Sequence, residues 1–365
     1  MFALTTKAEV EELVWGATVM GTGGGGSPRY GLRLLEEALS LRGEIKVVDI
    51  NELSENSIVV SPYYVGTIAP SAERRKPVKI GDPIRTAFEE LERVLGKRVS
   101  AVVACELGGS NTAVALYIAA KLNLPVVDGD LLGRAAPEIH QCTANIFGYP
   151  MYPAVIVTES GNIVVVKQYS DINDYEALAR YMSVIAGCSA AVVDTPLSAE
   201  NARKAVVKKT ISLCLSIGKA LREAWSTGKD PVEEVRRILG GWKIFEGEVT
   251  KYNWRDEGGF LRGEAYLKGT GEWRGHSFRT WIKNEHIMAW RDNKPIVMPP
   301  DLIIFFSDKG KPITNAELSE GMKVSVIAAK APEIWRTPRG LELFGPRHFG
   351  LDYDYIPVEE LVKES

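Results

Sequence analysis

Cysteine and histidine are scarce in this sequence, with four of each in 365 residues. The cysteines have no CxxC spacing and stand in apolar or helical surroundings, so we expect buried thiols rather than disulfides or a zinc knuckle. The histidines show no HxH or HExxH spacing, so zinc held mainly by imidazole is not expected. An oxygen-rich site for Mg²⁺ or Mn²⁺ remains compatible with the sequence.

Long hydrophobic runs and basic stripes are also missing. No segment approaches the roughly 18 uninterrupted apolar residues of a membrane span, so no membrane partner is expected. The first residues, MFALTTKAEVEELVW, carry acids where a signal peptide has its apolar run, which predicts a cytoplasmic protein. The net charge is -3 with both signs spread along the chain, which argues against a nucleic-acid partner.

Hydrophobic residues make up 45% of the chain, which is enough for a large core. Strand and helix patterns alternate over residues 1–170, which predicts an α/β domain with a mostly parallel sheet and flanking helices. Residues 171–365 are expected to form a second domain, with helices over 171–240 and a β-rich sheet or barrel over 241–357. Aromatic residues of this second part are assigned to sheet core and subunit contact, so we expect a homo-oligomer.

Two strand–turn units between residues 98 and 140 carry most of the acidic residues of interest. The run RVSAVVAC ends at Glu106, and after a helix the run LPVV ends at Asp128 and Asp130, followed by Arg134 and Glu138. Parallel strands joined by a helix bring their turns to one sheet edge, where open α/β sheets place ligands. We therefore expect these five side chains to converge; the alternative is that the acids cap helices and Arg134 neutralises Asp130.

A glycine-rich segment, GTGGGGSP, separates two predicted helices near the N-terminus. Such a loop presents backbone N–H groups and the positive end of a helix dipole to an anion. Its spacing differs from GxGxxG and a helix precedes it, so nucleotide binding is not expected. The alternative is a turn between helices. With the second glycine-rich turn, it supplies the predicted substrate-binding residues Gly23, Gly24, Gly25, Gly26, Ser27, Gly108, Gly109 and Asn111.

The β-rich part contributes polar residues at two places. Asn284, Glu285 and His286 interrupt an alternating strand, and Arg347 lies in the turn GPRHFG. We interpret the first group as a wall of the substrate pocket, or alternatively as a bulge with its polar groups in water. Arg134, Asn284, Glu285 and Arg347 complete the predicted substrate-binding set.

Several motifs in this order resemble the S-methyl-thiohydantoin desulfurase-like family. They are GTGGGGSP (21–28), CELGGSN (105–111), LPVVDGDLLGRAAPE (124–138), GGFLRG (258–263), KNEHIMAW (283–290), PPDLI (299–303) and GPRHFGLDYDYIP (345–357). The resemblance covers nearly the whole chain. It implies an α/β N-terminal domain, a β-rich C-terminal domain and, for the activity that named the family, hydrolytic removal of methanethiol from an S-methylated thiohydantoin. Genes of the family stand near hydantoinase and oxoprolinase genes, which implies such an enzyme as a partner.

Residue chemistry assigns the roles in this reaction. Water attack on a ring carbon needs a base, charge stabilisation and an acid. We expect Glu106 or Asp128 to activate water, directly or through a divalent ion (Mg, Mn or Zn) shared with Asp130, and Glu138 or His286 to supply the proton. The predicted catalytic residues are thus Glu106, Asp128, Asp130, Glu138 and His286, and the predicted metal ligands are Glu106, Asp128 and Asp130.

Three alternatives stay open at this point. Cys105 or Cys142 is the rival nucleophile, although both residues fit a buried thiol better. The protein is alternatively a non-catalytic subunit that binds a small ligand or metal beside a hydantoinase-type enzyme. The acids are alternatively paired for structural reasons, with the active site elsewhere, for instance around Asn284 and Arg347.

Overall fold

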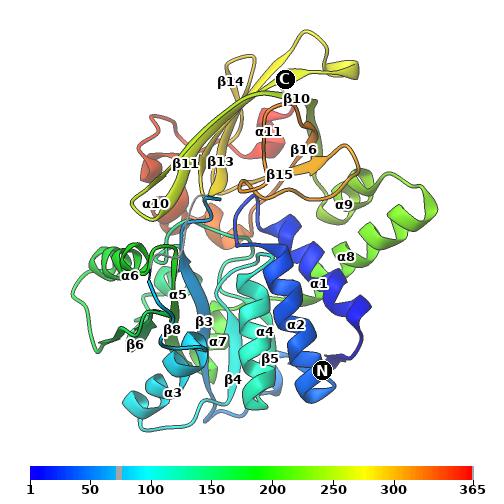
Figure 1. Ribbon diagram of the computed structural model, residues 1–365. Coiled ribbons are helices and arrows are strands. Elements are labelled where there is room, and N and C mark those ends of the chain that lie inside the picture. The colour runs from blue at the N-terminus through cyan, green and yellow to red at the C-terminus, as the bar shows by residue number, and fades with distance from the viewer. Residues whose placement is uncertain (71–75, 364–365) are drawn as a thin grey trace.

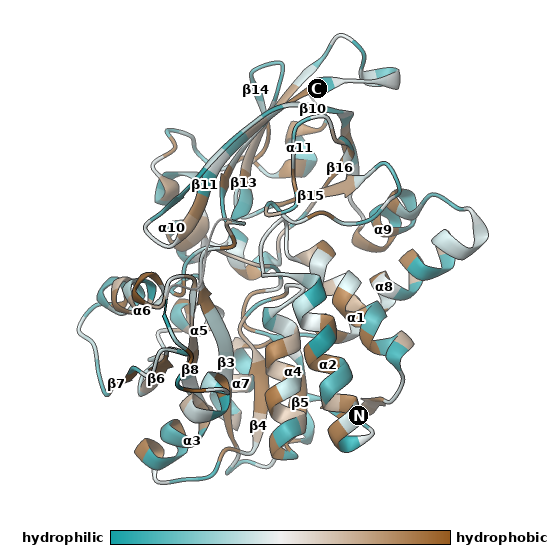
Figure 2. Ribbon diagram, viewed as in Figure 1, coloured by the Kyte–Doolittle hydropathy of each residue, from teal (hydrophilic) through white to brown (hydrophobic). Residues whose placement is uncertain are grey.

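The computed structural model describes residues 1–70 and 76–363. Within these residues the chain forms two β-sheets, a larger mixed sheet covered by helices and a smaller antiparallel sheet (Figure 1). Hydrophobic residues concentrate on the strands and on the inner sides of the helices that cover them (Figure 2). This is the α/β class with a β-rich C-terminal part that the sequence predicts.

The first sheet, sheet A, is parallel at its centre and antiparallel at its edges. Its path through the described residues is β1 (Phe2–Leu4), β2 (Ile45–Val48), β5 (Val126–Asp130), β4 (Ala101–Ala104), β3 (Ile58–Gly66), β8 (Ser189–Ser198), β6 (Ala154–Val157) and β7 (Ile163–Val166), with β9 (Val207–Lys208) paired to β5. Strands β2, β5, β4 and β3 run parallel, and the other pairings are antiparallel. The predicted β4–helix–β5 crossover is therefore present.

Helices cover both faces of sheet A. The described helices are α1 (Lys7–Met20), α2 (Pro28–Arg42), α3 (Pro83–Leu95), α4 (Asn111–Leu122), α5 (Thr143–Ile146), α6 (Ile172–Ala186), α7 (Ala199–Ala205), α8 (Thr210–Thr227), α9 (Pro231–Leu239), α10 (Pro338–Phe344) and α11 (Val358–Leu361), with 3₁₀ turns η1 (Ile50–Glu52), η2 (Gly271–Trp273), η3 (Glu333–Arg336) and η4 (Pro346–Phe349). Successive strand residues point to opposite faces. Val126 accordingly shares a core with α1, α2, α3, α4 and α8, whereas Val127 shares the other core with α6 and α7.

The second sheet, sheet B, is antiparallel throughout. Its order is β14 (Lys294–Val297), β13 (Glu285–Arg291), β12 (Ser277–Lys283), β11 (Phe260–Gly269), β10 (Trp242–Glu257), β16 (Lys323–Ala329) and β15 (Leu302–Ser307). The long strands β10 and β11 form its central hairpin, and a register shift between β12 and β13 lies next to Asn284. Figure 1 shows this sheet above the helical part of the molecule.

The segment 171–240, predicted to be helical, also contains a strand. Strand β8 follows α6 and pairs antiparallel with both β3 and β6, so the chain returns to sheet A after residue 170. A second, shorter strand in this segment, β9, separates α7 from α8. No helix in residues 1–70 and 76–363 has the length and apolar character needed to cross a bilayer.

Candidate active site

A cavity of about 390 Å³ lies beyond the carboxyl ends of β3 and β4, where sheet A meets the start of β13. This is the edge at which open α/β sheets place their ligands. Residues from both sheets and from the glycine-rich loop line it. Of the predicted site residues, its lining contains Glu106, Glu138, Asn111, Asn284, Glu285, Gly25, Gly26 and Ser27.

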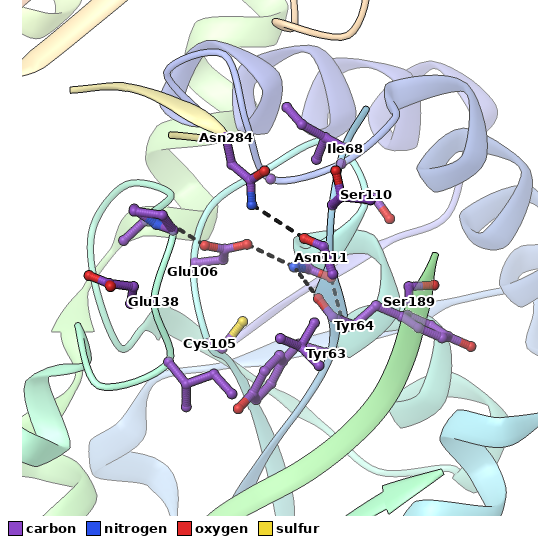
Figure 3. Close-up of a pocket in the computed structure, with 18 of the residues that line it drawn as sticks. Tyr63, Tyr64, Ile68, Cys105, Glu106, Ser110, Asn111, Glu138, Ser189 and Asn284 are labelled. Carbon is purple, nitrogen blue, oxygen red and sulfur yellow. Dashed lines mark hydrogen bonds between the residues drawn. The ribbon is translucent and has the colours of Figure 1, made fainter. Parts of the chain in front are cut away.

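Glu106 stands at the centre of the cavity wall in Figure 3. Its Oε1 accepts a hydrogen bond from Asn111 Nδ2 at 2.7 Å, and its Oε2 accepts one from the Ala136 amide at 3.0 Å. Burial raises the pKa of Glu106 above its ordinary value, although these two hydrogen bonds act in the opposite direction. The two hydrogen bonds fix the orientation of a buried carboxyl group that faces a cavity, as a general base requires.

Glu285 is the second buried carboxyl group of the cavity. Burial is the main cause that holds its pKa well above the ordinary value, and the charge of Glu106 adds to the effect. Its Oε2 has no hydrogen-bond partner among the described residues. Both buried carboxyl groups of this cavity therefore have raised pKa values, and that of Glu285 is raised further although the charge of Arg134 acts in the opposite direction.

Two asparagines hold the backbone of the site. The Asn111 side chain accepts a hydrogen bond from the Tyr64 amide and donates one to the Tyr64 carbonyl, which joins α4 to β3. Asn284, at a left-handed φ of 56°, accepts the Leu261 amide and donates to the Gly66 carbonyl. The NEH triplet thus accompanies a bulge, and its Asn284 and Glu285 line the cavity instead of facing water.

The glycine-rich loop between α1 and α2 packs against this site. A Cβ on Gly24 would lie 1.7 Å from Glu285 Oε1, and one on Gly25 would lie 2.4 Å from Gly108 Cα. The Gly25 carbonyl accepts the amides of Ser110 and Asn111 at the start of α4. Gly23, Gly24, Gly108 and Gly109 are absent from the cavity lining, so these predicted ligand contacts are replaced by close backbone packing.

Asp128 and Asp130 do not join Glu106. Both side chains alternate onto the face of β5 that α8 covers. The Asp128 carboxylate accepts the amide and the hydroxyl of Ser212, and Asp130 Oδ2 accepts the amides of Leu132 and Gly133. In the described residues the predicted metal trio does not form a ligand cluster, because the strand continues through Asp130 instead of ending before Asp128.

Arg134 and His286 lie behind the cavity wall. Arg134 is fully buried and donates to the carbonyls of Ala135, Pro300, Asp301 and His286 and to the Thr22 hydroxyl, so its donors are used within the protein. His286 stacks on Phe305, and burial lowers its pKa to about 3, so the ring is neutral. Neither side chain is placed to contact a ligand in the cavity.

Arg347 is on the outer surface. Its side chain is 64% exposed and pairs with Asp354 at 2.9 Å. It lines a separate shallow groove together with Pro338 and Tyr355 rather than the cavity. The prediction that Arg347 contacts the substrate is therefore not supported by its position.

Glu138 sits in a cluster of charged and imidazole groups at the rim. Its Oε1 accepts from Lys283 Nζ at 2.5 Å, and its Oε2 lies 2.7 Å from His348 Nε2 and 3.6 Å from His140 Nε2. These basic neighbours outweigh burial and lower the pKa of Glu138 to about 2. Within the described residues, Glu138, His140 and His348 form the group whose ligand atoms lie close enough together for one metal ion.

Asp194, Thr195 and Arg180 are among the lining residues that the sequence analysis did not identify, because their strand or partners were not recognised. Asp194 on β8 accepts hydrogen bonds from the hydroxyls of Tyr63, Tyr175 and Thr195, and burial raises its pKa to about 6. Thr195 itself and Arg180 also line the cavity. Identifying β8 from its apolar run SAAVV would have placed Asp194 near this edge.

The cysteines considered as nucleophiles both line the cavity. Burial holds the pKa of the Cys105 thiol well above its ordinary value and raises that of Cys142 to about 12. A thiolate is the reactive form of cysteine. Both residues therefore have the character of buried thiols, which is the interpretation that the sequence favours.

Comparison with known proteins gives the family and the fold. The model of the S-Me-THD-like N-terminal domain matches residues 8–168, and that of the S-Me-THD-like C-terminal domain matches residues 170–358. No curated protein matches the chain. An X-ray crystal structure of a protein from Chromobacterium violaceum is 25% identical, superposes with a TM-score of 0.79, and covers 98% of this chain and 100% of its own. The protein belongs to the S-Me-THD-like family.

Proposed function

We propose that the protein is a hydrolase of small cyclic amides, with an S-methyl-thiohydantoin or a hydantoin-type ring as its substrate class. One observation carries the proposal: two buried carboxyl groups, Glu106 and Glu285, line one cavity, and burial raises the pKa of both. Family membership supports the choice of ring. A volume of about 390 Å³ is within the range of small-molecule sites.

In the proposed reaction, ionised Glu106 takes a proton from water as the water oxygen bonds to the ring carbon that carries the S-methyl group. The C=N π electrons move to the ring nitrogen, which takes the remaining water proton as the new carbonyl forms. The C–S bond breaks, protonated Glu285 gives its proton to the departing methanethiolate, and Glu106 then passes its proton back to Glu285 through solvent. This assignment moves the acid role away from two predicted residues. Glu138 is ionised and paired with Lys283, and His286 is neutral behind the wall.

The test is an assay of methanethiol release from S-methyl-thiohydantoins and of ring opening of hydantoins. Glu106→Gln and Glu285→Gln keep the side-chain shape and remove the acid–base group, so each is expected to lower kcat by about 10²- to 10⁴-fold. Asp128→Asn is the matched control, because Asp128 is a buried carboxylate of the same sheet edge that bonds Ser212 outside the cavity.

Three results would contradict the proposal. Near-normal turnover by Glu106→Gln would remove the base. Binding of the rings without turnover by the wild-type protein would favour a non-catalytic subunit beside a hydantoinase- or oxoprolinase-type enzyme. Loss of activity in Cys105→Ser or Cys142→Ser, which keep the side-chain size, with the fold intact, would favour a nucleophilic thiol.

A further inference from the structure

The cluster at Glu138 brings three metal-ligating atoms together in an arrangement that the proposed function does not use. Three atoms meet there: Glu138 Oε2, His140 Nε2 and His348 Nε2. They are separated by 2.7 Å, 3.6 Å and 3.3 Å. In a tetrahedral zinc site with bonds of about 2.0–2.1 Å, ligand atoms are about 3.3 Å apart. The observed triangle has nearly these dimensions.

A single position satisfies all three atoms. A point about 0.8 Å out of the plane of the triangle lies about 2.05 Å from each of them, as a zinc–nitrogen or zinc–oxygen bond requires. We propose that Glu138, His140 and His348 bind one divalent transition-metal ion of the zinc class. The two histidines are 208 residues apart, so the local spacing that argued against zinc held by imidazole does not apply to them. Two imidazoles and one carboxylate leave the fourth tetrahedral position open.

The donor set excludes the hard cations. Mg²⁺ and Ca²⁺ take oxygen ligands, whereas imidazole nitrogen suits Zn²⁺ and its neighbours in the first transition row. The side chains are already confined, with exposures of 5% for His140, 19% for His348 and 14% for Glu138. Nδ1 of His140 has no hydrogen-bond partner among the described residues, so the ring is free to carry its proton there and present Nε2 to a metal.

Lys283 is a neighbouring cation that opposes metal binding. Its ammonium contacts Oε1 of Glu138, whereas the imidazoles face Oε2, so the carboxylate is divided between the two. The ring of Phe260 lies 4.6 Å from the ammonium and offers it a second favourable contact. Lys283 therefore weakens metal binding without occupying the metal position.

The ligands come from distant parts of the chain. Glu138 and His140 lie in the loop after β5, and His348 lies in η4, 208 residues from His140. A bound ion would therefore connect the sheet A part of the molecule to the C-terminal end. Because an ion that binds only the folded chain stabilises it, saturation should raise the melting temperature.

The experiment uses the full-length protein, stripped with a chelator and titrated with Zn²⁺ and Co²⁺ in the absence of substrate. We expect one equivalent to bind, tetrahedral d–d absorption bands with Co²⁺, and a higher melting temperature. His140→Ala and His348→Ala should weaken Zn²⁺ binding by at least about tenfold. His276→Ala is the control, because His276 pairs with Asp292 on the surface. Circular dichroism checks that each variant is folded.

Lys283→Met provides a variant that keeps all three ligands. Removing the opposing cation should strengthen Zn²⁺ binding by about tenfold, since one unit charge contact is lost. A folded wild-type protein that takes up no Zn²⁺ at micromolar concentrations would overturn the proposal and leave a hydrogen-bonded cluster. Equal metal binding by wild type, His140→Ala and His348→Ala would also overturn it. Neither result depends on hydrolysis, so the proposed function is tested separately.

Discussion

At the scale of single residues, burial changes the pKa of carboxyl groups and so makes stability depend on pH. Asp130 is fully buried at the end of β5, and burial raises its pKa from 3.8 to about 7. Between about pH 4 and pH 7 the folded protein keeps a proton that the unfolded chain has released. Stability therefore falls as the pH rises through this window, because the folded state binds more protons than the unfolded state.

Replacing Asp130 by Asn should remove this dependence. The amide oxygen of Asn can still accept the Leu132 and Gly133 amides. Relative to wild type, the free energy of unfolding of Asp130→Asn should rise by up to about 4 kcal/mol between pH 4 and pH 8. Urea unfolding at several pH values measures the difference. Parallel pH profiles for the two proteins would show that burial does not shift this carboxyl group.

The acidic residues that follow β4 and lie in β5 show which side-chain positions the sequence predicts and which it does not. The motif CELGGSN correctly places Glu106 in the cavity, because a residue directly after a buried parallel strand emerges at its carboxyl edge. Asp128 fails by the same rule, because β5 extends through Asp130 and the alternation of side chains turns both acids toward α8. The sequence analysis predicted helices over 171–240 without their boundaries, so it did not show that α8 begins at Thr210 and covers this face of β5.

At the scale of elements, the glycine-rich loop controls how closely β13 approaches α4. The boundaries of its helices were predictable, since Thr6 and Ser27 cap them and Pro28 opens the second. The need for glycine in this loop was not predictable. It comes from close contacts with Glu285 and Gly108, which are far away in the sequence. Strand β8 was missed for a related reason: a short apolar run between two helices has no period of its own to identify it.

Gly24→Ala tests this role of the loop. The added Cβ would lie 1.7 Å from Glu285 Oε1, so the carboxyl group must move. We expect a loss of about 1–3 kcal/mol in unfolding free energy and, under the proposed function, at least about a tenfold lower kcat. Gly81→Ala is the matched control, since no atom lies within 4 Å of the place that its Cβ would take. Equal stability and turnover of the two variants would mean that the loop adjusts freely.

At the scale of the whole molecule, Arg134 joins the two sheets. Its guanidinium leaves the loop after β5 and donates to the carbonyls of Pro300 and Asp301, just before β15, while Phe344 of α10 lies 4.9 Å from it. The sequence predicted the two architectures and the order of the motifs. It did not indicate that Arg134 holds the two sheets together. Composition and spacing do not distinguish an arginine that donates to backbone carbonyls from one that binds a substrate.

Arg134→Met should therefore act on stability more than on the site. The methionine fills part of the space but leaves buried carbonyls without donors, at about 1–3 kcal/mol for each unpaired group, so we expect a loss of about 3–5 kcal/mol in urea unfolding. Arg347→Met is the control, because the exposed pair of Arg347 with Asp354 should contribute less than about 1 kcal/mol. If Arg134→Met instead unfolds like Arg347→Met and loses only affinity for a cyclic amide, the arginine faces ligand and the two sheets are held together by their apolar contacts alone.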